Sequence, residues 1–174
     1  MVDEPSPLVS EAFPPTGRLA GIDYGTVRIG VSVCDPLRIL VSPLEIHQVV
    51  GEVRDSAYFQ ALVKRERIDG FVVGLPIHCD GGESEKSRQA REFARWLLNV
   101  TAIPVRLFDE RFTTSAAQSR MRSAAGSGKR TRHRQVDAIA AQVILESFLE
   151  AARYTGELPG QSVQAAASGD QPLE

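Results

Sequence analysis

The run LAGIDYGTVRIGVSV at residues 19–33 constrains the fold of this chain more than any other stretch. It begins with a compact apolar run that has no helical spacing. It ends with Val27, Ile29, Val31 and Val33, which alternate with other residues at the period of a half-buried strand. These patterns predict two strands joined by a short connection around Gly25.

Asp23 ends the first of these strands, where a buried carboxylate costs several kcal/mol unless it is paired, hydrogen-bonded or bound to a cation. Two interpretations are open on this stretch alone. Asp23 organises the turn through its side chain, as turn aspartates often do, or it belongs to a ligand site. Gly25 permits the tight turn and leaves room for a ligand beside the backbone.

The rest of the chain alternates strands with helices. We expect a third strand at 39–46, placed at an edge because of Pro43, and further strands at 68–75 and 104–109. Helices are expected at 52–67, 84–99, 113–121 and 135–154, the second of them with the clearest helical spacing of apolar residues. An antiparallel meander followed by βαβ crossovers predicts an α/β fold with a mixed sheet and helices on its faces.

One folded domain is expected at 18–154, between a disordered leader at 1–17 and a disordered tail at 155–174. The leader is acidic and proline-rich and has neither the basic start nor the apolar block of a signal peptide. No apolar run approaches the roughly 20 residues that span a bilayer. We therefore expect a cytoplasmic protein without a membrane partner. Cys34 and Cys79 form no disulfide framework and no CxxC metal pair.

The other carboxylates favour the ligand-site interpretation of Asp23. Asp109 and Glu110 end the fifth expected strand, and Asp137 lies in the first turn of the last expected helix, at the margin of its apolar face. Each also has a plain structural interpretation. Asp137 gains modestly from the helix dipole, and the other two cap the next helix or pair with Arg111.

Carboxylates brought together raise one another's pKa values, so that a cluster needs compensation. Hard divalent cations such as Mg²⁺ or Mn²⁺ supply it, and two such ions can activate water and stabilise the leaving oxygen in phosphodiester cleavage. A divalent-metal nuclease is the function that this pattern favours.

A basic segment precedes Asp137. Residues 120–135 carry six Lys or Arg and no Asp or Glu, in a chain whose formal net charge is −2. An ordinary solvated charge run is the plain interpretation. Its place beside a candidate metal carboxylate favours contacts with a nucleic acid backbone. The candidate phosphate-binding residues are Arg28, Lys129, Arg130, Arg132 and Arg134.

These motifs together resemble the YqgF family, also called RuvX, of ribonuclease H-like nucleases. The matching features are GIDYGTVRIGVSV, VVGLP followed by DGGES, DERFTT, and VDAIAAQVILESFLE, which occur in order over residues 19–150. The resemblance implies a ribonuclease H-like fold with a five-stranded sheet in the order 3-2-1-4-5, in which strand 2 is antiparallel.

The same resemblance implies a catalytic metal site at Asp23, Glu110 and Asp137. It also implies a role in maturation of the small-subunit ribosomal RNA precursor, in resolution of Holliday junctions, or in both. Symmetric cutting of a four-way junction requires a homodimer. Related resolvases carry an acidic residue at the end of the fourth strand, where this chain has GLP at 74–76. Glu110 would have to reach across from the fifth strand, and Asp80 and Asp109 are secondary candidates.

Two other classes of protein stay open at this point. A sugar-kinase or chaperone-type ATPase shares the fold and a similar GIDxGT phosphate loop, although such proteins close two lobes over the nucleotide and this chain has room for one. A non-catalytic RNA-binding or ribosome-assembly module would use the basic segment and keep the carboxylates for structure. No aromatic-rich strand like those of base-stacking RNA-binding sheets is present in the sequence.

Overall fold

The run at 19–33 forms two antiparallel strands, β1 (Arg18–Asp23) and β2 (Arg28–Cys34), in a computed structural model that describes residues 12–77, 82–112 and 132–165. β2 pairs in turn with β3 (Val41–Gln48), which completes the predicted meander. β3 begins later than the expected strand at 39–46. The reason is Asp35, whose carboxylate accepts hydrogen bonds from the backbone amides of Ile39 and Leu40 and keeps them in the turn.

Two crossovers extend the sheet on the other side of β1. Helix α1 (Glu52–Glu66) leads to β4 (Ile68–Leu75), and α2 (Glu85–Thr101) leads to β5 (Val105–Asp109), with β1, β4 and β5 parallel. Ser84 caps α2 because its hydroxyl accepts a hydrogen bond from the backbone amide of Ser87. A short 3₁₀ helix, η1 (Glu110–Phe112), follows β5. The expected helix at 113–121 lies outside the described residues.

The sheet has six strands in the order β3-β2-β1-β4-β5-β6, so the predicted order is right and the predicted number is one short. The additional strand, β6 (Gln161–Ser162), pairs antiparallel with β5 inside the segment expected to be a disordered tail. Arg106 fixes the residues just before β6, because its guanidinium donates hydrogen bonds to the carbonyl oxygens of Leu158, Pro159 and Gly160.

The expected disordered leader also needs correction over residues 12–17. Phe13 is buried, and its ring meets that of Phe148 edge-on with 5.9 Å between centroids. The guanidinium of Arg38 donates to the carbonyl oxygens of Pro14, Thr16 and Gly17. Short apolar and charged anchors of this kind fix a chain end that composition alone marks as disordered.

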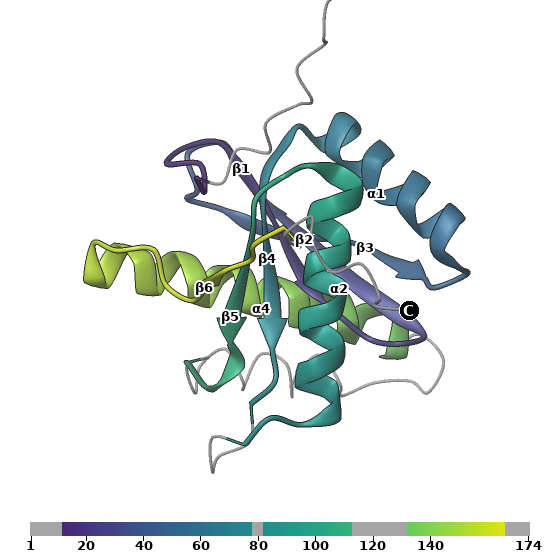
Figure 1. Cartoon of the computed structure of the whole chain (residues 1–174). Coiled ribbons are helices and arrows are strands. Elements are labelled where there is room, and N and C mark those ends of the chain that lie inside the picture. The colour runs from purple at the N-terminus through teal and green to yellow at the C-terminus, as the bar shows by residue number, and fades with distance from the viewer. Residues whose placement is uncertain (1–11, 78–81, 113–131, 166–174) are drawn as a thin grey trace, which may run out of the picture.

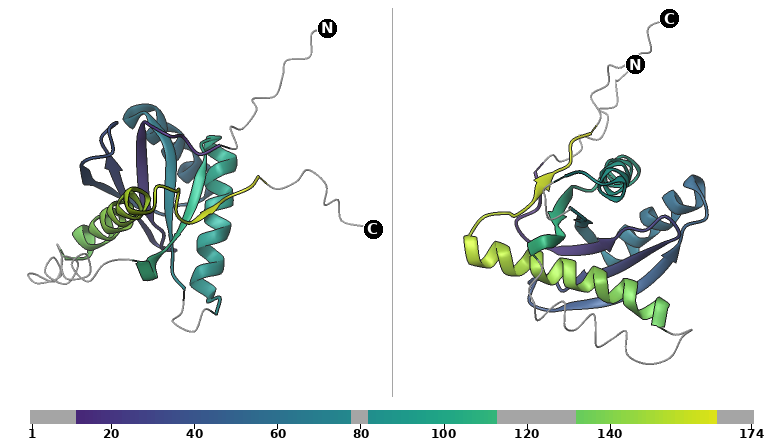
Figure 2. Two further views of the ribbon diagram at one scale, coloured as in Figure 1. Left: turned by 90° about the vertical axis from the view of Figure 1, so that its left-hand side faces the viewer. Right: turned by 90° about the horizontal axis from the view of Figure 1, so that it is seen from below.

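One long helix covers the second face of the sheet. Figures 1 and 2 show α1 and α2 on one face and α4 (Arg132–Thr155) on the other. Each face has its own apolar core, which includes Phe59, Phe71 and Phe93 on the first face and Phe108 and Phe148 on the second. No helix in the described part of the chain is long and apolar enough to span a membrane.

Glycines let α4 lie close to the sheet. A Cβ atom on Gly30 would lie 1.9 Å from the backbone oxygen of Asp137, and one on Gly21 would lie 2.7 Å from that of Ala141. The Ser32 hydroxyl, also on β2, donates to the same Ala141 oxygen over 2.8 Å. This close contact fixes α4 beside the ends of β1 and β2 and so positions Asp137.

Candidate active site

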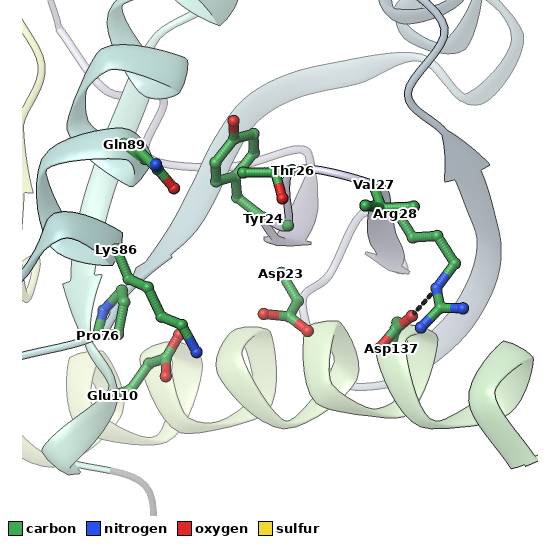
Figure 3. A pocket seen from close by; sticks show the side chains of 11 residues that line it. Asp23, Tyr24, Thr26, Val27, Arg28, Pro76, Lys86, Gln89, Glu110 and Asp137 are labelled. Carbon is green, nitrogen blue, oxygen red and sulfur yellow. Dashed lines mark hydrogen bonds and ion pairs between the residues drawn. The ribbon is translucent and has the colours of Figure 1, made fainter.

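The three predicted carboxylates line one cavity of about 410 Å³. Asp23 comes from the end of β1, Glu110 from the residue after β5, and Asp137 from α4, as Figure 3 shows. The carboxyl ends of parallel strands β1 and β5 meet at this edge of the sheet, and α4 crosses beside it. The other lining residues are Tyr24, Gly25, Thr26, Val27, Arg28, Pro76, Lys86 and Gln89.

Asp23 lies between the other two carboxylates in Figure 3. Its pKa is raised to about 7, mainly by burial and in addition by the charges of Glu110 and Asp137, while the charge of Lys86 acts to lower it. A carboxyl group in these surroundings holds its negative charge at neutral pH only at a cost in free energy. A bound cation would remove that cost.

Glu110 reaches the cavity over the end of β4. Its Oε1 lies 2.6 Å from where a Cβ atom on Gly74 would be, and Gly74 pairs with Phe108 of β5. The absence of a side chain at Gly74 therefore makes room for a carboxylate that arrives from the neighbouring strand. Burial raises the pKa of Glu110, the charge of Asp109 adds to this effect, and Lys86 opposes it.

Asp137 is ion-paired with Arg28, whose Nε donates to Oδ2 over 2.9 Å. The helix begins at Arg132 rather than at the expected residue 135, so Asp137 lies in its second turn and not its first. The proposed stabilisation of this carboxylate by the helix start is thereby removed, because that effect falls off within the first turn. Arg28 neutralises the carboxylate instead.

Asp109 does not line the cavity, although it was a secondary candidate. Its carboxylate accepts hydrogen bonds from the backbone amide and the guanidinium of Arg111. Burial acts to raise the pKa of Asp109, but these hydrogen bonds and the charge of Arg111 outweigh it and the pKa is lowered. The structural interpretation, in which Asp109 pairs with Arg111, is the one the geometry supports.

The basic segment is described only at its end. Arg132 and Arg134 lie in the first turn of α4. Asp80, Lys129 and Arg130 lie outside the described residues.

Lys86 and Gln89 are lining residues that the sequence reasoning did not single out. Both lie near the start of α2, and Figure 3 shows the Lys86 side chain extending towards Glu110. A signal was available. The first turn of a crossover helix follows the carboxyl end of a parallel strand, which is the edge where α/β sites form. The lysine at the start of the helix expected at 84–99 was therefore a candidate.

The donor set suits a hard divalent cation, because it consists of carboxylate oxygens and one carboxyl group, that of the partly buried Asp23, has a raised pKa. In the part of the chain that the structure describes, no three Asp, Glu, His or Cys side chains lie close enough together to hold one ion. The Arg28–Asp137 ion pair occupies one side of the cavity. Side-chain rearrangement is therefore needed before the three carboxylates can bind a cation together, and for Asp137 it includes release from Arg28.

Comparisons with known proteins agree with this architecture. Thermus thermophilus RuvC in complex with a Holliday junction substrate has a similar structure, with a TM-score of 0.53 at 17% identity over 79% of this chain and 96% of that one. Another structure of the same RuvC gives a TM-score of 0.51 at 16% identity, covering 83% of this chain and 99% of that one. The fold is thus ribonuclease H-like, as predicted.

Sequence relatives are much more similar. A Rhodopirellula baltica protein named "Putative pre-16S rRNA nuclease" is 58% identical over 94% of both chains. A Rhodobacter capsulatus protein of the same name is 40% identical over 86% of this chain and 93% of its own. The family model for RuvX, described as Holliday junction resolvase, matches residues 17–151. The chain therefore belongs to the RuvX family, as its motifs indicated.

Proposed function

We propose that this protein is a divalent-metal-dependent nuclease whose reaction centre is the cavity lined by Asp23, Glu110 and Asp137. The observation that carries the proposal is the convergence of three carboxylates from distant parts of the chain on one cavity. The pKa of Asp23 is raised by its burial and by the charges of the other two carboxylates. Structural carboxylates are normally paired, whereas functional sites accept such a cost.

Asp23, Glu110 and Asp137 would hold Mg²⁺ or Mn²⁺ through their carboxylate oxygens. When bound, such ions lower the pKa of water and stabilise the charge of the leaving oxygen in phosphodiester hydrolysis. Asp23 must be deprotonated to contribute, and Lys86 favours that state because its charge lowers the pKa values of Asp23 and Glu110. Gly25 and Thr26 border the same cavity and contribute little side-chain bulk to it, which leaves room for a phosphate.

Arg28 can pair with either of two anions, the carboxylate of Asp137 or a phosphate of the substrate. In the free protein its guanidinium holds Asp137, and on the substrate it would instead contact a phosphate. The exchange releases Asp137 at the moment a polyanion enters. Lys129, Arg130, Arg132 and Arg134 would add backbone contacts along the nucleic acid, since they belong to the basic segment that leads into α4.

The names of the relatives point to two substrates. We propose precursor 16S ribosomal RNA as the first, on the names of the curated relatives, and a Holliday junction as the second, on the description of the family model. Processing at the 5′ end of that RNA stays a prediction from the family resemblance. A cytoplasmic location and a homodimer on junction DNA stay predictions from the sequence.

A paired cleavage assay tests this function. Precursor 16S RNA and a synthetic four-way DNA junction are each incubated with Mg²⁺ or Mn²⁺ and wild-type protein, Asp23→Asn or Glu150→Gln. Glu150 is an exposed residue of α4 and serves as the control for loss of one negative charge. Wild type and the control should cut, whereas Asp23→Asn should lose at least about two orders of magnitude in rate while keeping its affinity for the nucleic acid.

Other outcomes assign the protein to the other classes. Tight ATP binding without nuclease activity would point to the chaperone-type ATPase. RNA binding without cleavage by the wild type, at every metal and RNA tested, would point to a ribosome-assembly module.

A further inference from the structure

A second cavity, of about 350 Å³, adjoins the candidate active site on the side of α1 and α2. Tyr24 and Gln89 line both cavities, so these two side chains form the wall between them. Figure 3 shows Tyr24 next to Asp23, and Gln89 on α2 above Lys86. The volume lies within the range of roughly 300–1,000 Å³ typical of small-ligand sites.

Aromatic rings form one side of this second cavity. Tyr24 stacks on Phe93 with 4.6 Å between ring centroids and 23° between planes, and Trp96 follows Phe93 at 5.5 Å. Phe93 is buried beneath its neighbours, whereas Tyr24 and Trp96 are only partly buried. A flat ring entering the cavity would therefore find aromatic surface on which to stack.

Carboxylates also line this cavity. Glu52 of α1 and Glu92 of α2 line the cavity, and no Lys or Arg is among the described residues that do. Glu92 Oε1 accepts a hydrogen bond from the guanidinium of Arg88 over 2.8 Å, so Glu52 and the second oxygen of Glu92 are the acceptors that a ligand would meet. Asp55 also lines it, but its carboxylate is already committed to His47 and to the backbone amides of Val50 and Gly51. Glutamates only accept hydrogen bonds, so this surface repels phosphate and suits an uncharged ring with N–H donors.

We propose that this cavity is a subsite for an unpaired nucleobase next to the scissile phosphate, and that it prefers guanine. Guanine presents two adjacent N–H donors on its Watson–Crick edge, which match a carboxylate acceptor, and every base offers a face for stacking. Because Tyr24 and Gln89 wall both cavities, a nucleotide with its phosphate at the carboxylate site has its base within reach of the subsite.

The subsite rests on the proposed nuclease function and narrows its substrate class. A base inside a duplex is stacked and paired and cannot enter such a cavity without being extruded. The expected substrate therefore carries an unpaired guanosine beside the cut, in a single-stranded end or at a branch point.

Trp96 is the only tryptophan in the chain, so its fluorescence reports on this cavity directly. The probes are uridine hexaribonucleotides that carry one central guanosine, adenosine or cytidine, titrated into the full-length protein in EDTA so that no cleavage occurs. The guanosine probe should quench Trp96 and bind about tenfold more tightly than the cytidine probe. Equal affinity for all three probes, or no quenching, would overturn the proposal.

A double variant, Glu52→Gln and Glu92→Gln, tests the acceptors. It should lose the preference for guanosine and gain relative affinity for adenosine, because an amide matches the donor and acceptor pair of adenine. Glu150→Gln removes a charge from the opposite face of the sheet and should leave the preference unchanged. A variant with a damaged fold would bind all three probes more weakly and would not change its preference from guanosine to adenosine.

Two further results would separate this inference from the nuclease proposal. Base-selective quenching in a protein that cleaves nothing would support the subsite and contradict the nuclease. If an arginine-rich peptide displaced the guanosine probe and bound far more tightly, the cavity would instead be a docking site for a basic protein segment, and the subsite would be excluded.

Discussion

The guanidinium of Arg28 on β2 donates to the carboxylate of Asp137 on α4 over 2.9 Å, and the two residues are 109 positions apart in the chain. The side chains are 33% and 25% exposed, so solvent screens the pair and its net contribution to stability is about 1 kcal/mol or less. An interaction of that strength can be exchanged for a phosphate or a metal ion. In the free protein, Asp137 is therefore paired with Arg28 and becomes available to a cation only when that ion pair breaks.

Arg28→Gln should separate metal binding from nucleic acid binding. Releasing Asp137 should tighten the binding of Mn²⁺ to the protein alone by about three- to tenfold, because about 1 kcal/mol of competing interaction is lost. The same change should weaken nucleic acid binding and reduce the slope of its salt dependence by about one. Electron paramagnetic resonance titration of Mn²⁺ measures the first effect. Arg54→Gln, an exposed charge loss on α1, should change neither affinity.

Asp23 should make the metal-free protein less stable as the pH rises. Its pKa is about 7 in the folded state against 3.8 for a freely exposed aspartate, so between these values the folded protein keeps a proton that the unfolded chain releases. The stabilisation is complete below about pH 4 and is lost as the pH passes through about 7. Asp23→Asn should therefore be more stable than wild type at about pH 8, by on the order of a few kcal/mol, and nearly equal at about pH 4.

Thermal melts in EDTA at the two pH values measure this difference. Added Mg²⁺ should raise the melting temperature of the wild type at the higher pH more than that of Asp23→Asn, since metal binding is linked to folding. If the wild type were as stable as the variant at the higher pH, the charged form of Asp23 would not lower the free energy of unfolding, which contradicts the prediction.

Gly74→Ala should damage the site more than the fold. Its Cβ would lie 2.6 Å from Glu110 Oε1 and 2.5 Å from Ile144 Cδ1, which are ends of side chains that can move away. We expect a loss of about 1–2 kcal/mol in the free energy of unfolding and at least about a tenfold loss of cleavage, because Glu110 is displaced.

Gly30→Ala is the contrasting variant. Its Cβ would meet the backbone of α4 rather than a movable side chain, so the loss of stability should be clearly larger, about 3 kcal/mol or more. Urea denaturation measures the free energy of unfolding of both variants. Equal losses would contradict the prediction, because they would show that the backbone of α4 moves aside as readily as the Glu110 side chain.

Lys86→Gln should shift the pH dependence of cleavage. The positive charge of Lys86 lowers the pKa values of Asp23 and Glu110, so its removal raises both. The acidic limb of the pH–rate profile should move to higher pH, and the shift should shrink at high salt because Lys86 is exposed. Lys64→Gln, an exposed charge loss on α1, should leave the limb in place.

The residue patterns alone determined the strand meander and the carboxylates that were candidates for the site, whereas the sheet order and the choice of Glu110 over Asp109 came from the resemblance of the motifs to a known family. Period-two alternation in β2 and helical spacing in α2 are local properties, because each side chain's face follows from its position along its own element. Asp23 was identifiable since a charged residue at the end of a buried strand needs a reason to be there.

Only the tertiary structure decided how the site is held together. Glu110 reaches the cavity because Gly74, on another strand, has no side chain, and Asp137 is neutralised by an arginine from a distant strand. β6 and residues 12–17 likewise have a defined position because Arg106 and Arg38 donate hydrogen bonds to backbone carbonyl oxygens of these segments or of the residues next to them. Such contacts join residues far apart in the chain, and their energies depend on distances that only the assembled sheet and helices set.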